Sequence, residues 1–198
     1  GIPWGHVSSG CIYSGRKSDG GGWTEEDVPN FSFRNGPCSF YSGTKALGEE
    51  VLKDAKNCYV WRLRIPFNEE KSPRNYLQKL LHYSSLLEAE NSISHIDDYI
   101  NSCLSSFTQE CEPGIYNLTN SGSITTRQVV KWMKEEGVTD KEFNFFENEE
   151  DFMAKAAITP RSNCVMDTSK AERNGIALRP VEEAVRDSLR KMREQVLA

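Results

Sequence analysis

A strand–helix–strand succession in the first third of the chain constrains the fold most. Residues 57–65 (Asn-Cys-Tyr-Val-Trp-Arg-Leu-Arg-Ile) are rich in β-branched and aromatic side chains and are stopped by Pro66, as expected of a strand. An earlier strand is expected over residues 6–13, and a helix over about 40–56 separates the two. A helix of that length between two strands is typical of a βαβ unit, whose strands run parallel. The sequence therefore predicts an α/β fold built on a parallel sheet.

The remainder of the chain alternates between helical and extended patterns. Thr125 is placed to cap a helix that Gly137 ends. Three consecutive glycines at 20–22 lie in a loop and lack the G-x-G-x-x-G spacing that binds dinucleotide phosphates. Further elements are expected as helices over residues 74–83, 97–108, 127–136, 168–175 and 180–195, as a strand over 114–119, and as a short strand and a short helix within 140–156.

Composition and charge narrow the class of protein. A chain of 198 residues can form one sizeable core, or one domain with a smaller attached lobe. Its net charge of -5 argues against nucleic acid and anionic membrane surfaces as partners. No apolar run approaches the roughly 20 residues of a membrane span, and the first residues lack the charged start and apolar core of a signal peptide.

Six cysteines and three histidines are scattered along the chain. No two cysteines form a Cys-x-x-Cys pair and the histidines lie far apart, so the spacing of a zinc site is absent. Six cysteines at this length do not make a disulfide scaffold, which predicts a reducing, cytoplasmic location. His95 precedes Asp97 and Asp98, and this pattern fits the charged start of a helix better than a metal site. No metal is therefore predicted.

Tyr41 and Lys45 lie four residues apart near the start of the predicted 40–56 helix. That spacing places both side chains on one helix face, one turn apart. A nearby ammonium group stabilises a phenolate, so we expect the pKa of Tyr41 to fall below the ordinary value of about 10 and the phenol to transfer protons. The spacing alone is a weak signal and is more often that of a surface tyrosine and a solvated lysine.

Three segments stand in a characteristic order: Ser9-Gly10-Cys11-Ile12, Tyr41-x-x-x-Lys45 and Arg64-Ile65-Pro66-Phe67. Their order and spacing resemble the Ser/Thr, Tyr and Lys set of the extended short-chain dehydrogenase/reductase family. Within that family the likeness is greatest to the dTDP-4-dehydrorhamnose reductases and to the bifunctional nucleotide-rhamnose synthases, which combine 3,5-epimerase and 4-reductase activities. The likeness extends over nearly the whole chain through residues 26–31, 72–79, 91–93, 116–120 and 160–167.

The resemblance implies a Rossmann-like parallel sheet with a smaller α/β substrate-binding lobe. In such proteins a Gly-rich loop in the N-terminal half binds the dinucleotide, and here that loop would lie upstream of Gly1. Residues 1–67 are accordingly expected to form the C-terminal part of the dinucleotide-binding domain, with the catalytic residues. Residues 68–198 are expected to form mainly the substrate-binding lobe, with the strand at 114–119 returning to the sheet.

The resemblance also assigns roles in reduction by NADP or NAD. Tyr41 would give a proton to the forming alkoxide, and Lys45 would tune that tyrosine and bind the nicotinamide ribose. Ser9 would position the sugar carbonyl. Pro66 and Phe67 would lie near the nicotinamide.

A second set of roles concerns epimerisation and substrate binding. In the bifunctional enzymes, positions matching Cys11 and Lys79 move protons at carbons 3 and 5. The same residues could instead be an inert buried cysteine and a solvated lysine. The resemblance further implies substrate-binding residues, which are Arg74, Asn75, Arg161, Ser162 and Asn163.

These features predict an NAD(P)H-dependent reductase of a nucleotide-4-keto-6-deoxyhexose in rhamnose-type deoxysugar synthesis, with or without 3,5-epimerase activity. Two alternatives stay open. One is an NAD-dependent epimerase or dehydratase of nucleotide sugars, and the other is a sugar-nucleotide-binding fragment without a cofactor. The expected partner is a nucleotide sugar, and a homodimer is compatible with the sequence.

Overall fold

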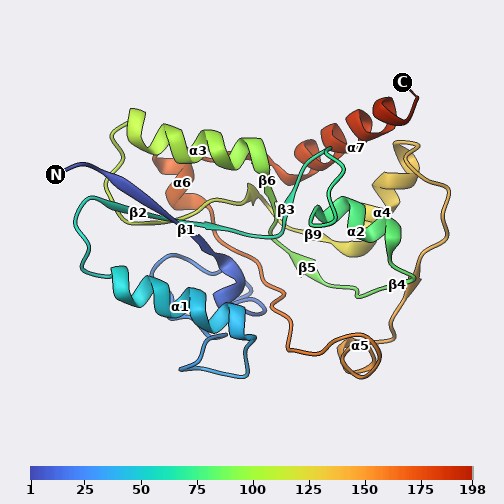
Figure 1. Cartoon of the computed structure of the whole chain (residues 1–198), viewed down its shortest axis with the longest axis horizontal. Helices are drawn as coiled ribbons and strands as arrows, with labels where there is room; N and C mark the ends of the chain where they lie inside the picture. Colours follow the sequence, from blue (N-terminus) through green and yellow to red (C-terminus); the bar gives the residue numbers. More distant parts are fainter. Residues whose placement is uncertain (198) are drawn as a thin grey trace.

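The computed structural model describes residues 1–197 and contains a parallel sheet of three strands. These strands are β1 (Trp4–Ser9), β2 (Cys58–Leu63) and β7 (Ile115–Asn117), in the order β1-β2-β7. Both neighbouring pairs run parallel. Helix α1 (Phe40–Leu52) joins β1 to β2 and lies on one side of the sheet, whereas α3 (Ile96–Thr108) and α6 (Ser169–Arg173) lie on the other (Figure 1). The predicted βαβ unit and α/β fold are confirmed.

Strand β2 is the buried centre of this sheet, because its side chains alternate between two covered faces. Tyr59 and Trp61 pack into a core with Tyr99 of α3 and Tyr116 of β7. On the opposite face, Arg62 forms an ion pair with Glu49 of α1 at 2.6 Å. The side chains of this pair are only 2% and 7% exposed, so the α1 face of the sheet contains a buried charge pair.

A second core lies at the other end of the molecule, among α2, α4 and α7 (Figure 1). The bounds of these helices are Tyr76–His82, Thr126–Glu135 and Val181–Leu197. Helix α5 (Glu149–Lys155) stands apart from them (Figure 1). Pairs of short strands connect the helices: β3 (Pro66–Phe67) with β6 (Ser94–His95), β4 (Ser85–Leu86) with β10 (Asn144–Phe145), β5 (Glu90–Asn91) with β9 (Ile124–Thr125), and β8 (Asn120–Ser121) with β11 (Leu178–Pro180).

The start of α4 confirms the cap predicted at Thr125. The Thr125 hydroxyl accepts a hydrogen bond from the backbone N–H of Gln128 at 3.2 Å. The Gln128 side chain in turn accepts from the backbone N–H of Thr125 at 2.8 Å. This reciprocal capping box satisfies two backbone donors that the first helical turn leaves free.

The strand expected over residues 6–13 was predicted too long. It ends at Ser9, and a 3-10 turn over Gly10–Ile12 follows. The Ser9 hydroxyl accepts from the Cys11 backbone N–H at 3.1 Å, which turns the chain out of the extended conformation. Trp4 and Val7 are 42% and 48% exposed, and in the part of the chain that the structure describes no strand pairs with the outer edge of β1.

The strand predicted over 114–119 is present as β7 and pairs with β2. The division of the chain after residue 67 stays a prediction. Among residues 1–197, no helix is both long enough and apolar enough to cross a membrane.

Candidate active site

The carboxyl ends of β1 and β2 open into a pocket of about 300 Å³. In parallel α/β sheets, ligands characteristically bind at this end of the strands. The pocket is lined by Ser9, Cys11, Tyr41, Leu63, Ile65, Pro66, Arg74, Tyr76 and Lys79. It therefore brings together residues that the sequence singled out on four separate segments of the chain.

Ser9 and Cys11 enter the pocket from the turn that follows β1. Ser9 is buried, with 3% of its surface exposed, and its oxygen accepts from the Cys11 N–H. Because that bond uses a lone pair of the hydroxyl, the Ser9 proton stays available to donate to a ligand oxygen. Cys11 is partly buried, and its Sγ accepts a hydrogen bond from Nη1 of Arg64 at 3.0 Å.

Tyr41 lines the pocket from the first turn of α1, where Ser39 caps the helix. Partial burial raises the pKa of Tyr41 above its ordinary value, and Cys11 adds to this effect, whereas Ser9 and Arg64 oppose it. The prediction that Lys45 lowers this pKa is therefore wrong for the structure as it stands.

The Lys45 ammonium group lies 5.8 Å from the centre of the Tyr41 ring. It donates instead to the Val7 carbonyl at 3.1 Å, so its charge is directed at β1.

Lys79 reaches the same pocket from α2, and Arg74 reaches it from the loop before that helix. Pro66 lines the wall between them and β2. Phe67 does not line the pocket, contrary to the prediction. Its side chain is fully buried in the second core and packs edge-on against the His95 ring, with 5.4 Å between the ring centres. The alternation of side chains along β3 explains why neighbouring residues face different surroundings.

Asn75 also has a structural role in place of the expected contact with substrate. Its side-chain oxygen accepts from the Leu77 N–H at 3.1 Å and so caps α2. Its amide nitrogen donates to the carbonyls of Asn68 and Glu70, both at 2.8 Å. Asn75 is buried, and these bonds occupy its polar atoms. Its neighbour Arg74 lines the pocket and can contact a ligand.

Arg161, Ser162 and Asn163 lie outside the residues that line the pocket. The Ser162 hydroxyl donates to the Tyr13 carbonyl at 2.5 Å, and the Asn163 side chain accepts from Asn91 at 3.2 Å. Arg161 is exposed, and its guanidinium lies 6.0 Å from the centre of the Phe152 ring on α5. This segment borders the site through the Ser162 carbonyl, which accepts from Arg64.

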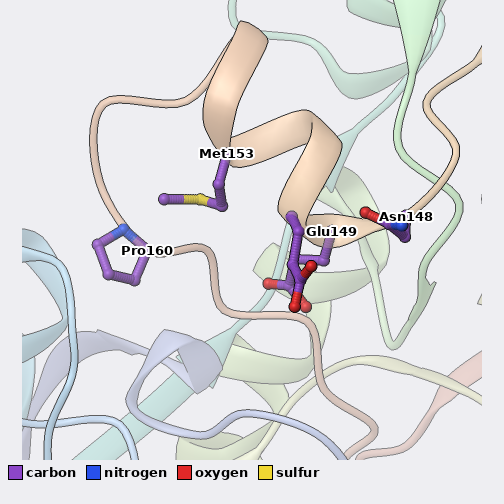
Figure 2. A pocket seen from close by; sticks show the side chains of 5 residues that line it. Asn148, Glu149, Met153 and Pro160 are labelled. Carbon is purple, nitrogen blue, oxygen red and sulfur yellow. The ribbon is translucent and has the colours of Figure 1, made fainter.

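A larger hollow of about 800 Å³ lies beside α5, where Met153 and Pro160 line it together (Figure 2). Its remaining lining residues are Asn148, Glu149 and Glu150. This hollow shares no residue with the pocket at the strand ends. Its two glutamates would repel an anionic nucleotide sugar, so we place the site at the strand ends.

Arg64 lies behind the pocket and contacts its lining residue Cys11, and the sequence analysis assigned it no role of its own. It follows β2, is 2% exposed, and contacts Cys11, Asn91 and Ser162. The available signal was a second arginine, two residues after Arg62, in an otherwise apolar segment. Arginine is seldom fully buried without a partner, so each of these two predicts a specific contact.

His95 is the N-terminal cap of α3, and its Nδ1 accepts from the Asp98 N–H at 3.4 Å. This placement agrees with the predicted helix start. Within residues 1–197, no group of three or more histidine, cysteine, aspartate or glutamate side chains could hold a metal ion. The six cysteines are all free thiols.

The fold and the pocket define an α/β protein whose site lies at the carboxyl ends of parallel strands. A family model described as the RmlD substrate binding domain matches residues 1–194, and the chain belongs to this family.

Two curated relatives illustrate the sequence similarity. The bifunctional dTDP-4-dehydrorhamnose 3,5-epimerase/dTDP-4-dehydrorhamnose reductase of Arabidopsis thaliana is 30% identical over 185 residues, which cover 91% of this chain and 59% of that protein. A trifunctional UDP-glucose 4,6-dehydratase/UDP-4-keto-6-deoxy-D-glucose 3,5-epimerase/UDP-4-keto-L-rhamnose-reductase of the same plant is 30% identical over 185 residues and is covered to 26% of its length. The chain thus spans only part of these relatives.

Solved structures share the fold. The UDP-rhamnose synthase of Acanthamoeba polyphaga mimivirus superposes with a TM-score of 0.86 at 24% identity, over 96% of this chain and 65% of that one. A dTDP-4-dehydrorhamnose reductase from Bacillus anthracis, solved in complex with NADP, gives a TM-score of 0.73 at 15% identity, over 98% of this chain and 66% of that one. At these identities the similarity establishes the architecture alone.

Proposed function

We propose that this chain carries the substrate-side active site of an NAD(P)H-dependent reductase of nucleotide-linked 4-keto-6-deoxyhexoses, and that the same site epimerises the sugar at carbons 3 and 5. The observation that carries the proposal is the convergence of Ser9, Cys11, Tyr41 and Lys79 on one pocket. The names of the curated relatives support this substrate class. A cytoplasmic location remains part of the proposal.

For reduction, the Ser9 hydroxyl donates to the 4-keto oxygen and holds the carbonyl in place. Tyr41 gives its proton to the alkoxide that forms on that oxygen. The raised pKa of Tyr41 suits this role, because the phenol keeps its proton at neutral pH until the alkoxide develops. The alkoxide is a far stronger base than a phenolate, so the transfer runs downhill.

The residues of the chain fit the nicotinamide end of a dinucleotide. Tyr41 and Pro66 line the pocket, and Lys45 lies one helical turn from Tyr41 with donors that can bind ribose hydroxyls. Tyr41, Lys45 and Pro66 would hold the nicotinamide end of NADPH or NADH, which would supply the hydride for carbon 4. Phe67 is excluded from this set because its side chain belongs to the second core.

For epimerisation, Cys11 and Lys79 enter the pocket from different elements, the turn after β1 and helix α2. One group removes a proton from the carbon next to the ketone, and the other returns a proton to the opposite face. The Ser9 hydroxyl stabilises the intermediate enolate at the keto oxygen. Arg74 supplies a positive charge at the pocket for the anionic substrate, and Arg161, Ser162 and Asn163 are proposed to bind its nucleotide end.

The test uses the chain with UDP- and dTDP-4-keto-6-deoxyglucose in deuterated buffer. We expect deuterium to enter at carbons 3 and 5, and Cys11→Ser to abolish this exchange while NADPH-dependent reduction of a pre-epimerised sugar continues. Cys38→Ser is the matched control, since Cys38 is also partly buried but lies outside the pocket. Unchanged exchange in the Cys11 variant would refute its role.

NADPH consumption separates the alternatives. Net oxidation of NADPH with a 4-keto sugar nucleotide supports a reductase, whereas conversion without net oxidation supports an NAD-dependent epimerase or dehydratase. Failure of the chain to bind NADPH at micromolar concentrations would support a binding fragment and refute the reductase proposal for this chain.

A further inference from the structure

Arg64 carries a buried positive charge that contacts no carboxylate among residues 1–197. Its side chain is 2% exposed. In the described chain, its hydrogen bonds go to the Cys11 thiol, the Asn91 side-chain oxygen and the Ser162 carbonyl. Its Nε has no hydrogen-bond partner among residues 1–197. None of these three acceptors is a carboxylate, so the described contacts give the guanidinium no fixed anionic partner.

Arg62, two residues earlier, is a buried arginine whose charge is neutralised by a carboxylate. It makes three contacts with the Glu49 carboxylate, at 2.6, 2.9 and 3.2 Å. Removing a charge from water without an anionic partner is energetically costly. The contrast indicates that Arg64 acquires its anion from a group that can ionise, and the groups of that kind beside it are the thiols of Cys11 and Cys164.

The two thiols differ in ways that select Cys11. Cys164 is 1% exposed and donates its thiol hydrogen to the Gly10 carbonyl at 3.4 Å, and burial raises its pKa. A thiol that is buried and donates a hydrogen bond keeps its proton. Cys11 is less buried, lines the pocket, and accepts its hydrogen bond from the cation. Accepting a charge-assisted hydrogen bond favours the thiolate.

The other groups around Cys11 support the same state. The titratable or charged side chains that share the pocket with Cys11 are Tyr41 from α1, Arg74 from the loop before α2, and Tyr76 and Lys79 from α2. Arg74 and Lys79 are cations, and burial raises the pKa of both phenols, which are neutral at physiological pH. Among the described residues no carboxylate lines the pocket, so no pocket side chain opposes a negative charge on Cys11.

We propose that Arg64 is a positioning residue that holds Cys11 as a thiolate aimed into the pocket, and so makes Cys11 the base of the epimerisation. The reaction assigned to this pair depends on the proposed function. The thiolate itself does not, because it follows from the contacts of the chain alone.

The proton balance of the step is as follows. The Cys11 sulfur takes the proton from the carbon next to the ketone, so that a C–H bond breaks and an S–H bond forms. The electron pair of the broken bond moves into the enolate. The Lys79 ammonium then gives a proton to the opposite face, and transfer of the thiol proton to the neutral amine restores both groups. Arg64 stays protonated throughout and stabilises the sulfur before and after the transfer.

The rigid setting of Arg64 explains why an arginine is suited to this position. Asn91 accepts from Arg64, and its amide group also bonds to Asn163 and to the Cys164 backbone. The planar guanidinium thus spans fixed acceptors and presents one N–H to the sulfur. A lysine would supply the charge but could not satisfy three acceptors arranged around a plane.

The test measures the alkylation rate of each cysteine by iodoacetamide as a function of pH, read peptide by peptide in the mass spectrometer. The midpoint is the pH at which the alkylation rate of a cysteine reaches half of its maximum. In the wild-type chain we expect the midpoint for Cys11 to lie at least about one pH unit below that for Cys38, which corresponds to about a tenfold difference in thiolate fraction. Arg64→Gln should raise the Cys11 midpoint by a similar amount, and Arg64→Lys by less. Cys164→Ser is the control, and it should leave the Cys11 midpoint low.

Equal midpoints for Cys11 and Cys38 in the wild-type chain would overturn the proposal, even if Arg64→Gln fails to fold. An unchanged Cys11 midpoint in a folded Arg64→Gln would overturn it equally. The proposed function is tested separately by exchange at carbons 3 and 5, whose pH profile should move upward in Arg64→Lys. A low Cys11 midpoint without any exchange would refute the epimerase activity and leave the Arg64–Cys11 pair standing.

Discussion

Replacing Glu49 should destabilise the chain far more than replacing its neighbour Glu50, because only Glu49 neutralises a buried charge. Arg62 and Glu49 have 2% and 7% exposed side chains, and Ser8 also donates to the Glu49 carboxylate at 2.5 Å. Removing one partner of such a pair costs about 3–5 kcal/mol, since the remaining charge has no compensation. For Glu49→Ala this is a large part of the roughly 5–15 kcal/mol that stabilises an ordinary domain.

The assay is urea unfolding followed by circular dichroism. With an m-value of about 2 kcal/mol/M, the loss moves the midpoint of Glu49→Ala down by about 2 M. Glu50→Ala is the matched control on the same helix, because its ion pair with Arg34 is exposed at the surface and should matter little. Equal midpoints for the two variants would show that the buried pair is not needed. The double replacement Glu49→Leu with Arg62→Met should recover much of the loss.

Three further predictions follow from individual contacts. Tyr41→Phe should lower the rate of 4-keto reduction, measured by NADPH oxidation, by about 10²–10⁴-fold. Exchange at carbons 3 and 5, measured by deuterium incorporation, should persist. Equal loss of both activities would contradict the assignment of Tyr41 as the acid of the reduction alone. Gly5→Ala should lower the free energy of unfolding in urea by about 1–3 kcal/mol, because the new methyl group would lie 2.0 Å from the Trp61 ring. Gly48→Ala, whose new methyl group has its nearest neighbour at 3.8 Å, should not destabilise the chain. Thr125→Ala should cost about 1 kcal/mol through loss of the capping box, and an unchanged unfolding midpoint would refute that contribution.

The parts of the fold that depend on local sequence could be predicted. The central strand β2, the preceding helix α1 and the Thr125 cap all follow from side chains within a few residues of one another. The end of that strand was predicted too late, because β2 ends at Leu63 and Pro66 begins β3. The boundaries were less certain, because they depend on hydrogen bonds that compete with regular structure. At Ser9 a single bond from the hydroxyl to the Cys11 backbone ends the strand early.

The site was harder to predict, because its chemistry depends on contacts between distant segments. The family resemblance predicted that Ser9, Tyr41 and Lys79 belong to one site, and all three line one pocket, but their electrostatic surroundings could not be inferred from spacing. The expected effect of Lys45 on Tyr41 failed because the ammonium group found a carbonyl acceptor on β1. Arg64 was overlooked for the same reason, since the thiol that it contacts lies 53 residues earlier in the chain.

The outer edge of β1, with which no strand of the described chain pairs, has a consequence for how the pocket is enclosed. Such an edge offers free backbone donors and acceptors to any extended segment. Because β1 and β2 run parallel and both end at the pocket, a segment that pairs with β1 in the same direction would also end beside Ser9. Docking at this edge would therefore build a further wall beside Ser9, so that sheet extension and access to the pocket are geometrically linked.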